Sequence, residues 1–172
     1  MMPADEIAKI RGKVTASRAR LLAEVEGLQG RHWDWHSADD HFSVRQTLSH
    51  VGSAQRNHLQ VAHSILSGTA INLPEFDLNT WNVAQVAKRG GWTPDEVLAD
   101  LRGAHEETLA FLDGLDSEKL TLTGSHPALG EVSVGQVLRI IALHDGIHRR
   151  EIARLRAEMR RVPTPSQQPG TG

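Results

Sequence analysis

The chain has 172 residues, of which 39% are hydrophobic, so it is long enough to fold as one domain with a sizeable core. Lysine and arginine number 19 against 21 acidic residues, and the formal charge of −2 lacks the basic excess expected of a nucleic-acid-binding protein. Ten histidines but no cysteine are present, which excludes disulfides, thiolate ligands and a thiol nucleophile and leaves His, Asp and Glu for any metal site.

Two amphipathic helices are predicted in the first part of the chain. Apolar residues recur at three- and four-residue steps over residues 3–28, which is the pattern of a helix with one buried face. After a polar and aromatic connection, Ser43 and Gln46 have the spacing of a capping box, in which two side chains satisfy free backbone donors at a helix start. This predicts a second helix over residues 43–67, with Gly68 as its end.

A long connection separates the second helix from the third. Residues 69–91 are too many for a simple turn, although residues 79–88 could form a short helix. Long connections of this kind often serve as lids or binding loops. Thr93 and Glu96 then form a second capping box, which predicts a third helix over residues 93–115.

The last helix follows a second connection. Alternating apolar residues within 117–134 allow a short hairpin. Ser133 and Gln136 give a third capping box, and the apolar period then continues over residues 134–159. The tail beyond Val162 has the proline, glycine and polar content of a disordered segment.

These elements predict an all-α fold. We expect an antiparallel four-helix bundle over residues 1–161, with a long connection between helices two and three that is able to cross over, and a disordered tail over residues 162–172. The longest apolar runs are too short for a membrane span, and residues 1–6 lack the layout of a secretory signal. A cytoplasmic protein is therefore expected.

The motif HDGIHRRE in the last helix is the first candidate site. A helix advances about 100° per residue, so His144 and His148 lie one turn apart on one face and can bind a single metal ion. Two imidazoles do not complete a site, because metal centres need a third donor from elsewhere in the fold. The apolar residues that share the face of His144 are Val137, Ile141, Leu155 and Met159.

His50 is the candidate third donor, because it lies at the flank of the buried arc of the second helix. A single inward-facing histidine is usually a hydrogen-bonded core residue. For a pair one turn apart with a third histidine on another helix, metal binding explains the cluster equally well, since one ion satisfies all three imidazoles. Both interpretations stay open at this stage.

Other metal motifs are excluded by missing residues. A di-metal carboxylate site needs Glu-x-x-His on two helices, and no glutamate here has a histidine three positions later. The HExxH motif of zinc proteases is absent. His144 and Asp145 form an HD doublet, but no later aspartate completes the phosphohydrolase pattern.

Three stretches resemble the DinB/YfiT-like superfamily of four-helix metal-binding proteins. They are FSVRQTLSHV around His50, FDLNTWN in the long connection, and HPALGEVSVGQVLRIIALHDGIHRREIARLR at the end. The resemblance extends to about Met159. It implies that His50, His144 and His148 bind one divalent metal ion, commonly zinc or nickel, with water completing the shell.

Glu151 departs from the family pattern, which often has glutamine at this position. It lies on the same helix face as the two histidines before it. A fourth metal donor, a proton acceptor in catalysis and a partner of a neighbouring arginine are three open roles, and Glu151 is our candidate catalytic residue.

The resemblance also implies an activity. Relatives include S-transferases and an isomerase that use low-molecular-weight thiols, and others proposed as hydrolases. Our leading hypothesis is a metal-dependent transferase that presents a small thiol to an electrophile bound under the 69–91 loop, with Asn79, Trp81 and Asn82 lining the pocket. A hydrolase with a metal-activated water is the alternative, and a non-catalytic, stress-related binding scaffold is the competing class.

The expected partners are a small-molecule substrate and, because family members often dimerise through the bundle, a second copy of the chain; no nucleic acid or membrane partner is expected. Two further histidines, His32 and His36, have a four-residue spacing without a helical register, so we interpret them as a chance pair. The nearby Trp33 and Trp35 fit packing as well as pocket lining. A surface or hydrogen-bonded role is expected for His41, His58, His63, His105 and His126.

Overall fold

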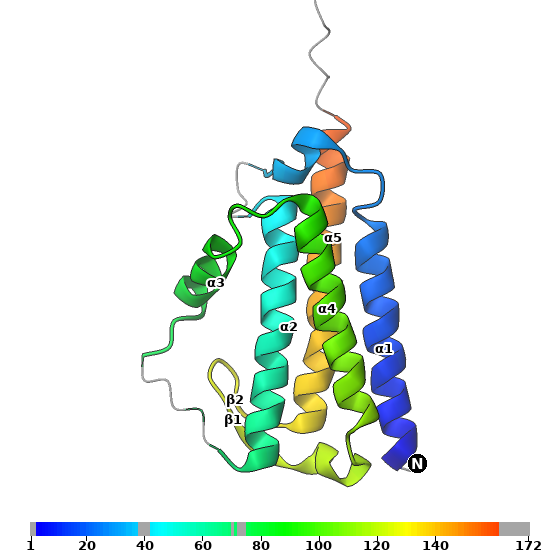
Figure 1. Ribbon diagram of the computed structural model, residues 1–172, viewed down its shortest axis with the longest axis vertical. Helices are drawn as coiled ribbons and strands as arrows, with labels where there is room; N and C mark the ends of the chain where they lie inside the picture. Colours follow the sequence, from blue (N-terminus) through cyan, green and yellow to red (C-terminus); the bar gives the residue numbers. More distant parts are fainter. Residues whose placement is uncertain (1–2, 38–41, 70, 72–74, 162–172) are drawn as a thin grey trace, which may run out of the picture.

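Four long helices form the body of the protein. The computed structural model describes residues 3–37, 42–69, 71 and 75–161. The helices pack side by side around a common core (Figure 1). This arrangement confirms the predicted four-helix bundle with a long connection in its middle. The bounds are α1 Pro3–Ala23, α2 Val44–Ser67, α4 Pro94–Asp113 and α5 Val134–Met159.

The long connection makes two neighbouring helices parallel. In Figure 1, α1 and α5 run from bottom to top, whereas α2 and α4 run from top to bottom. Contacts between α2 and α4 follow the same direction: Arg45 donates to the carbonyl oxygen of Trp92 near one end, and Gln55 donates to Thr108 farther along. Parallel neighbours require a crossover, which the residues between α2 and α4 supply.

The three predicted capping boxes are all present. Ser43, Thr93 and Ser133 each accept a hydrogen bond from a backbone N–H in the first turn, and the Gln or Glu three residues later accepts one in return. Gly68 ends α2 with a φ of 68°, a left-handed conformation that glycine adopts without strain. Local sequence chemistry therefore sets these helix ends.

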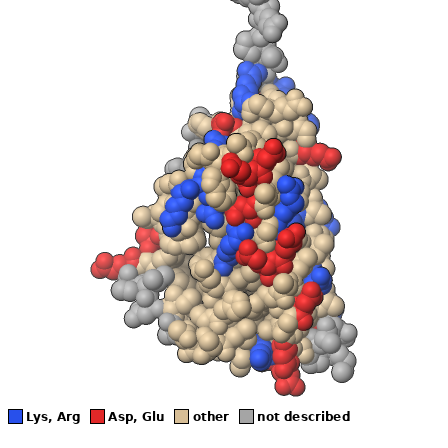
Figure 2. Space-filling model, viewed as in Figure 1, with Lys and Arg blue, Asp and Glu red and all other residues tan. Residues whose placement is uncertain are grey.

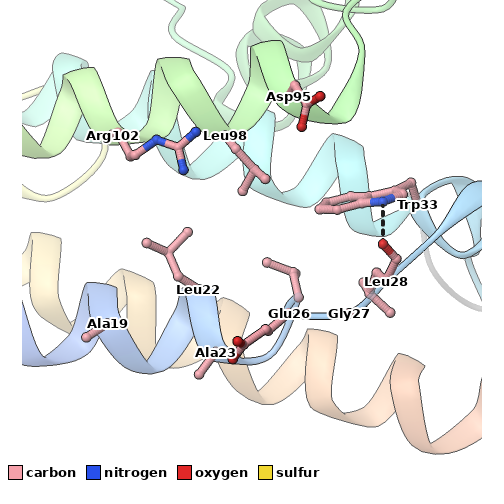
Figure 3. A pocket seen from close by; sticks show the side chains of 11 residues that line it. Ala19, Leu22, Ala23, Glu26, Gly27, Leu28, Trp33, Asp95, Leu98 and Arg102 are labelled. Carbon is pink, nitrogen blue, oxygen red and sulfur yellow. Dashed lines mark hydrogen bonds between the residues drawn. The ribbon is translucent and has the colours of Figure 1, made fainter.

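The first helix is shorter than its apolar pattern predicts, because α1 ends at Ala23 rather than at Leu28. Gly27, four residues beyond the helix end, adopts a φ of 76°, so an α-helix cannot run through this residue to Leu28. Trp33, in the short 3-10 helix η1 (Gly30–Asp34), is buried and donates from Nε1 to the carbonyl oxygen of Leu28 at 3.2 Å (Figure 3). This hydrogen bond keeps Leu28 in the connection to η1 and not in α1.

Smaller elements cover one side of α2 (Figure 1). The long connection forms α3 (Leu78–Ala87), one residue from the predicted position, and Asp77 caps it by accepting from the backbone N–H of Thr80. The predicted hairpin is also present, as β1 (Thr123–His126) paired antiparallel with β2 (Gly130–Ser133). A second 3-10 helix, η2 (Ser117–Thr121), precedes it.

The buried core consists of two apolar clusters. One lies at the end of the bundle that holds the hairpin, and the other lies towards η1. Along each helix, polar buried residues stand between the two groups of apolar positions. The first cluster includes Ile10, Val14, Leu59, Leu112, Leu138 and Ile141, and the second includes Leu21, Leu48, Val51, Leu101, Ile152 and Leu155.

The visible surface carries charges of both signs. Basic and acidic side chains are interspersed over α4 on the face that Figure 2 shows. Between α2 and α4, Arg56 pairs with Asp100 and with Glu107. No helix within the described ranges is long and apolar enough to cross a membrane.

Candidate metal centre

Three histidine side chains meet between the two apolar clusters. His50 comes from α2, and His144 and His148 come from successive turns of α5. The Nε2 atom of His144 lies 3.1 Å from Nε2 of His50 and 3.2 Å from Nε2 of His148. The three ligand atoms all lie within 4.8 Å of one another. The structure thus brings together the three residues that the sequence singled out.

The spacing fits a single divalent ion. In a tetrahedral zinc site with bonds of about 2.0–2.1 Å, two ligand nitrogens lie about 3.4 Å apart. The two short contacts of His144 are close to this value. Three protein ligands leave at least one coordination position for water or a substrate.

Burial keeps two members of the triad, His50 and His144, in their metal-binding protonation state. Desolvation, with the nearby His148, lowers the pKa of His50 to about 4. Desolvation and the neighbouring histidines lower the pKa of His144 to about 2. Both imidazoles are therefore neutral at neutral pH, and neutral imidazole is the form that binds a metal ion.

Glu151 lies behind His148, on the opposite side of the ring from the triad. Its Oε2 is 2.7 Å from Nδ1 of His148, so Nδ1 donates a hydrogen bond to the carboxylate. A carboxylate in this position orients a ligating histidine and makes it more basic. Glu151 is thus in contact with a triad member through the ring nitrogen that faces away from the cluster.

Protons alone do not satisfy the triad. Nε2 of His144 has one in-plane site, which holds either a proton or a lone pair, but it faces the Nε2 atoms of both His148 and His50. One site makes one linear hydrogen bond, so one of these two short contacts is left unmatched. His50 Nδ1 is also buried without a hydrogen-bond partner among the residues that the structure describes. A shared cation resolves the convergence of the Nε2 atoms.

A cavity of about 180 Å³ opens beside the triad, and His50 and His144 form part of its wall. The α3 residues Trp81 and Asn82 line it as expected, whereas the predicted Asn79 is not among its lining residues. The remaining wall is mostly apolar and comes from α2, α3, the hairpin loop and α5. A hollow of about 620 Å³ between α1 and α4 (Figure 3) has no histidine among its lining residues.

A second histidine pair lines the same cavity. His58 on α2 and His126 at the end of β1 are both buried, and Nε2 of His126 lies 3.4 Å from Nδ1 of His58. Their hydrogen bond agrees with the predicted role; the connection that holds His126 was a candidate to fold over the site, whereas the position of His58 beside the triad was missed. The sequence signal was weak: His58 follows His50 by two helical turns, and His126 lies shortly before the ligand helix.

The other histidines lie outside this cluster. His63 is exposed and packs edge-on against Phe111, and the ring of His36 contacts the carbonyl oxygen of Ser37. His105 is half-buried, and desolvation lowers its pKa. His32 is not part of the triad, and the remaining one, at position 41, lies outside the described residues.

A buried ion pair lies directly behind the triad. Arg18 of α1 and Asp145 of α5 are 3% and 1% exposed and form a two-pronged contact at 3.0 Å. Arg18 also donates to the carbonyl oxygen of Leu101 on α4 and to Gln55 on α2, which in turn donates to Thr108. This cluster joins all four long helices. The two residues of the HD doublet therefore belong to different clusters: His144 to the triad and Asp145 to the ion pair with Arg18.

Several solved structures share the fold. DfsB, a sibling lethal factor precursor, superposes with a TM-score of 0.75 at 16% identity, covering 90% of this chain and 96% of that chain. YfiT from Bacillus subtilis, described as a probable metal-dependent hydrolase with an unusual four-helix bundle topology, gives 0.72 at 22% identity, covering 89% and 87%. The colibactin self-resistance protein ClbS, solved with double-stranded DNA, gives 0.68 at 12%, covering 92% and 97%.

Family membership follows from the sequence itself. No curated protein matches the chain. A family model does match, over residues 13–152, a range that includes the triad and Glu151. The chain belongs to the DinB superfamily.

Proposed function

We propose that this protein is an enzyme that uses one divalent metal ion held by His50, His144 and His148. The observation that carries the proposal is the convergence of three Nε2 atoms at the wall of a cavity. A structural metal is normally enclosed by four protein ligands, whereas three ligands beside a cavity are typical of catalytic sites. Nitrogen ligands suit zinc and nickel, so either ion fits.

The leading activity is transfer of a low-molecular-weight thiol to an electrophile. When bound, a divalent ion lowers the pKa of a coordinated thiol or water and so supplies a nucleophile at neutral pH. The chain's own part is to bind the second reactant in the adjoining cavity. Its wall includes Phe76, Trp81 and Leu129, which favour an organic electrophile and limit the access of water.

Hydrolysis by a metal-activated water is the second candidate. It is favoured by the likeness to YfiT, which is described as a probable metal-dependent hydrolase. In either reaction we assign Glu151 to orienting His148, because it contacts the ring nitrogen opposite the triad. Cytoplasmic location, dimerisation and the absence of nucleic acid from the partners stay predictions; the DNA in the ClbS structure gives a reason to test the last of these.

Metal analysis tests the site. We expect protein purified without an immobilised-metal column to contain about one divalent ion per chain, the His50→Ala variant to contain almost none, and His63→Ala to match the wild type. His63 is a suitable control because it is an exposed histidine on the same helix. Equally low metal content in the wild type and His50→Ala would refute the site and leave the non-catalytic scaffold.

Two assays separate the activities. A transferase would consume a thiol, from a panel of bacterial low-molecular-weight thiols, together with chlorodinitrobenzene, and only in the metal-loaded protein. A hydrolase would release nitrophenol from para-nitrophenyl acetate without any thiol. If thiol consumption is absent while ester cleavage depends on the metal and on His50, the transferase proposal is wrong and the hydrolase is supported.

A further inference from the structure

In the second histidine pair, His58 and His126, the main chain determines which ring nitrogen donates the hydrogen bond. The backbone N–H of Ala128, in the hairpin turn, donates to Nδ1 of His126 at 3.1 Å. A ring nitrogen that accepts a hydrogen bond carries no proton, so the proton of neutral His126 is on Nε2. The tautomer of this histidine is thus set by the main chain of the hairpin.

The tautomer of His126 in turn determines the tautomer of His58. Nε2 of His126 faces Nδ1 of His58 at 3.4 Å, at the long end of hydrogen-bond distances, and donates to it. The proton of neutral His58 is therefore on Nε2. No described residue accepts a hydrogen bond from this nitrogen, and it is not among the buried atoms sealed from the surface. Since His58 lines the cavity, its free N–H is available to a molecule bound there.

The other residues that line the cavity indicate which chemical class of molecule it would bind. Apolar side chains surround it from the segment before α3, from the hairpin turn and from α5, including Phe76, Leu129 and Ile140. Among the described residues that line it, none is Lys, Arg, Asp or Glu. Apart from the proposed metal ion, this wall therefore offers no positive charge to a phosphate or another anionic group, whereas the N–H of His58 matches a neutral molecule with one acceptor oxygen.

We propose that His58, held by His126, is the substrate-binding hydrogen-bond donor of this cavity, and that it recognises the carbonyl or epoxide oxygen of a small, largely apolar electrophile. The assignment rests on the proposed function, because it places the reacting end of the substrate beside His50 and His144. His58 contacts substrate directly, and His126 is a positioning residue that acts through it. A second metal site is not indicated, because the single three-donor group found among the described residues contains neither His58 nor His126.

Nitrogen-15 NMR tests the tautomers without any need for metal or activity. In metal-free protein labelled at histidine nitrogens, we expect His58 and His126 to show protonated Nε2 and unprotonated Nδ1. In His126→Phe, the resonances of His58 should move towards a mixture of tautomers, whereas a purely space-filling His126 would leave them unchanged. A proton on Nδ1 of His58 in the wild type would overturn the assignment.

Ligand binding tests the donor. Acetophenone carries a carbonyl oxygen, and α-methylstyrene has a CH₂ group in its place, so the pair isolates one acceptor. In zinc-loaded protein, His58→Leu should weaken acetophenone binding by about 2- to 10-fold, the range set by one hydrogen bond, and leave α-methylstyrene binding unchanged. His58→Gln, which keeps an N–H, should retain part of the preference, and His63→Leu is the control with an exposed histidine.

The outcomes separate the two proposals. Equal losses for both compounds would show that His58 only shapes the cavity, and loss of zinc from His58→Leu would make it part of the metal site; either result refutes the donor role. If the wild type binds no zinc, the proposed function fails, whereas the NMR result and binding of acetophenone by metal-free protein still decide whether His58 is a donor.

Discussion

Two buried polar clusters lie side by side in the bundle, and they differ in how their atoms are satisfied. The Arg18 cluster matches donors to acceptors on all four long helices. The histidine triad directs three ring nitrogens at one point and leaves Nδ1 of His50 without a partner among the described residues. A satisfied polar network is a structural device, whereas converging unmatched acceptors indicate that a ligand belongs between them.

The largest effect should come from breaking the satisfied cluster. Arg18→Ala leaves Asp145 as a buried, unpaired charge, and we expect the free energy of unfolding to fall by about 3–5 kcal/mol. Urea unfolding of metal-free protein measures it. Arg11→Ala is the matched control, because Arg11 is on the same helix as Arg18 but forms a surface pair, with Asp113 of α4; its loss should cost at most about 1 kcal/mol. Similar losses in the two variants would contradict the structural role of the Arg18 cluster.

The next effect concerns the carboxylate behind the triad. Glu151→Ala removes the acceptor for Nδ1 of His148, and we expect metal affinity to fall by about 10- to 100-fold. Glu151→Gln keeps an acceptor oxygen and should retain most of the affinity. Competition with a chelating dye measures both variants. Equal losses for Ala and Gln would show instead that the negative charge itself is required.

The buried histidines His50 and His58 should make the stability of the protein depend on pH. Burial lowers the pKa of His50 and of His58 to about 4 from 6.5, so below pH 6.5 the unfolded chain binds more protons than the folded one. Metal-free protein should therefore lose stability as the pH falls from 6.5 to 4, by at most about 1.4 kcal/mol per pH unit for each group. Urea midpoints across this range measure the slope, which should be smaller in His50→Leu. An unchanged slope would mean that His50 is not buried in its neutral form.

The smallest effect should have the opposite sign to the first. His144→Leu replaces a partly buried polar ring with an apolar side chain of similar volume, and we expect metal-free protein at pH 7 to become more stable by up to about 1 kcal/mol while metal binding is lost. Thermal unfolding with and without chelator measures it. A marked loss of stability in the metal-free variant would place His144 in the structural cluster rather than in a ligand site.

The triad could be predicted from the sequence because most of the signals for it are local. Two ligands are one turn apart on one helix, the third lies on a helix opened by a capping box, and the family resemblance linked them. Arg18 was missed although it occupies the gap between Val14 and Leu21 in the apolar stripe of α1. Such a position predicts burial, but the sequence does not show that Asp145 is the partner.

The contact between His58 and His126 could not be predicted from the sequence, for a physical reason. The two residues are 68 positions apart, and their contact depends on how the hairpin folds against α2. The tautomers depend further on one backbone N–H in the turn. Periodicity predicts which face of a helix is buried, whereas it does not predict which loop covers that face.

The parallel packing of α2 with α4, and of α1 with α5, has a consequence for the order in which the chain assembles. Arg18 and Asp145 are 127 residues apart, so this contact closes most of the chain into one loop. Distant contacts slow folding, because the entropy of loop closure opposes them before they contribute any stabilisation. Between the parallel neighbours α2 and α4, Gln55 and Thr108 are also 53 positions apart, whereas helices joined by a short turn make contacts close in sequence. The bundle should therefore fold more slowly than an up-down-up-down bundle of equal length, and the docking of α5 onto α2 is the step that assembles the metal ligands.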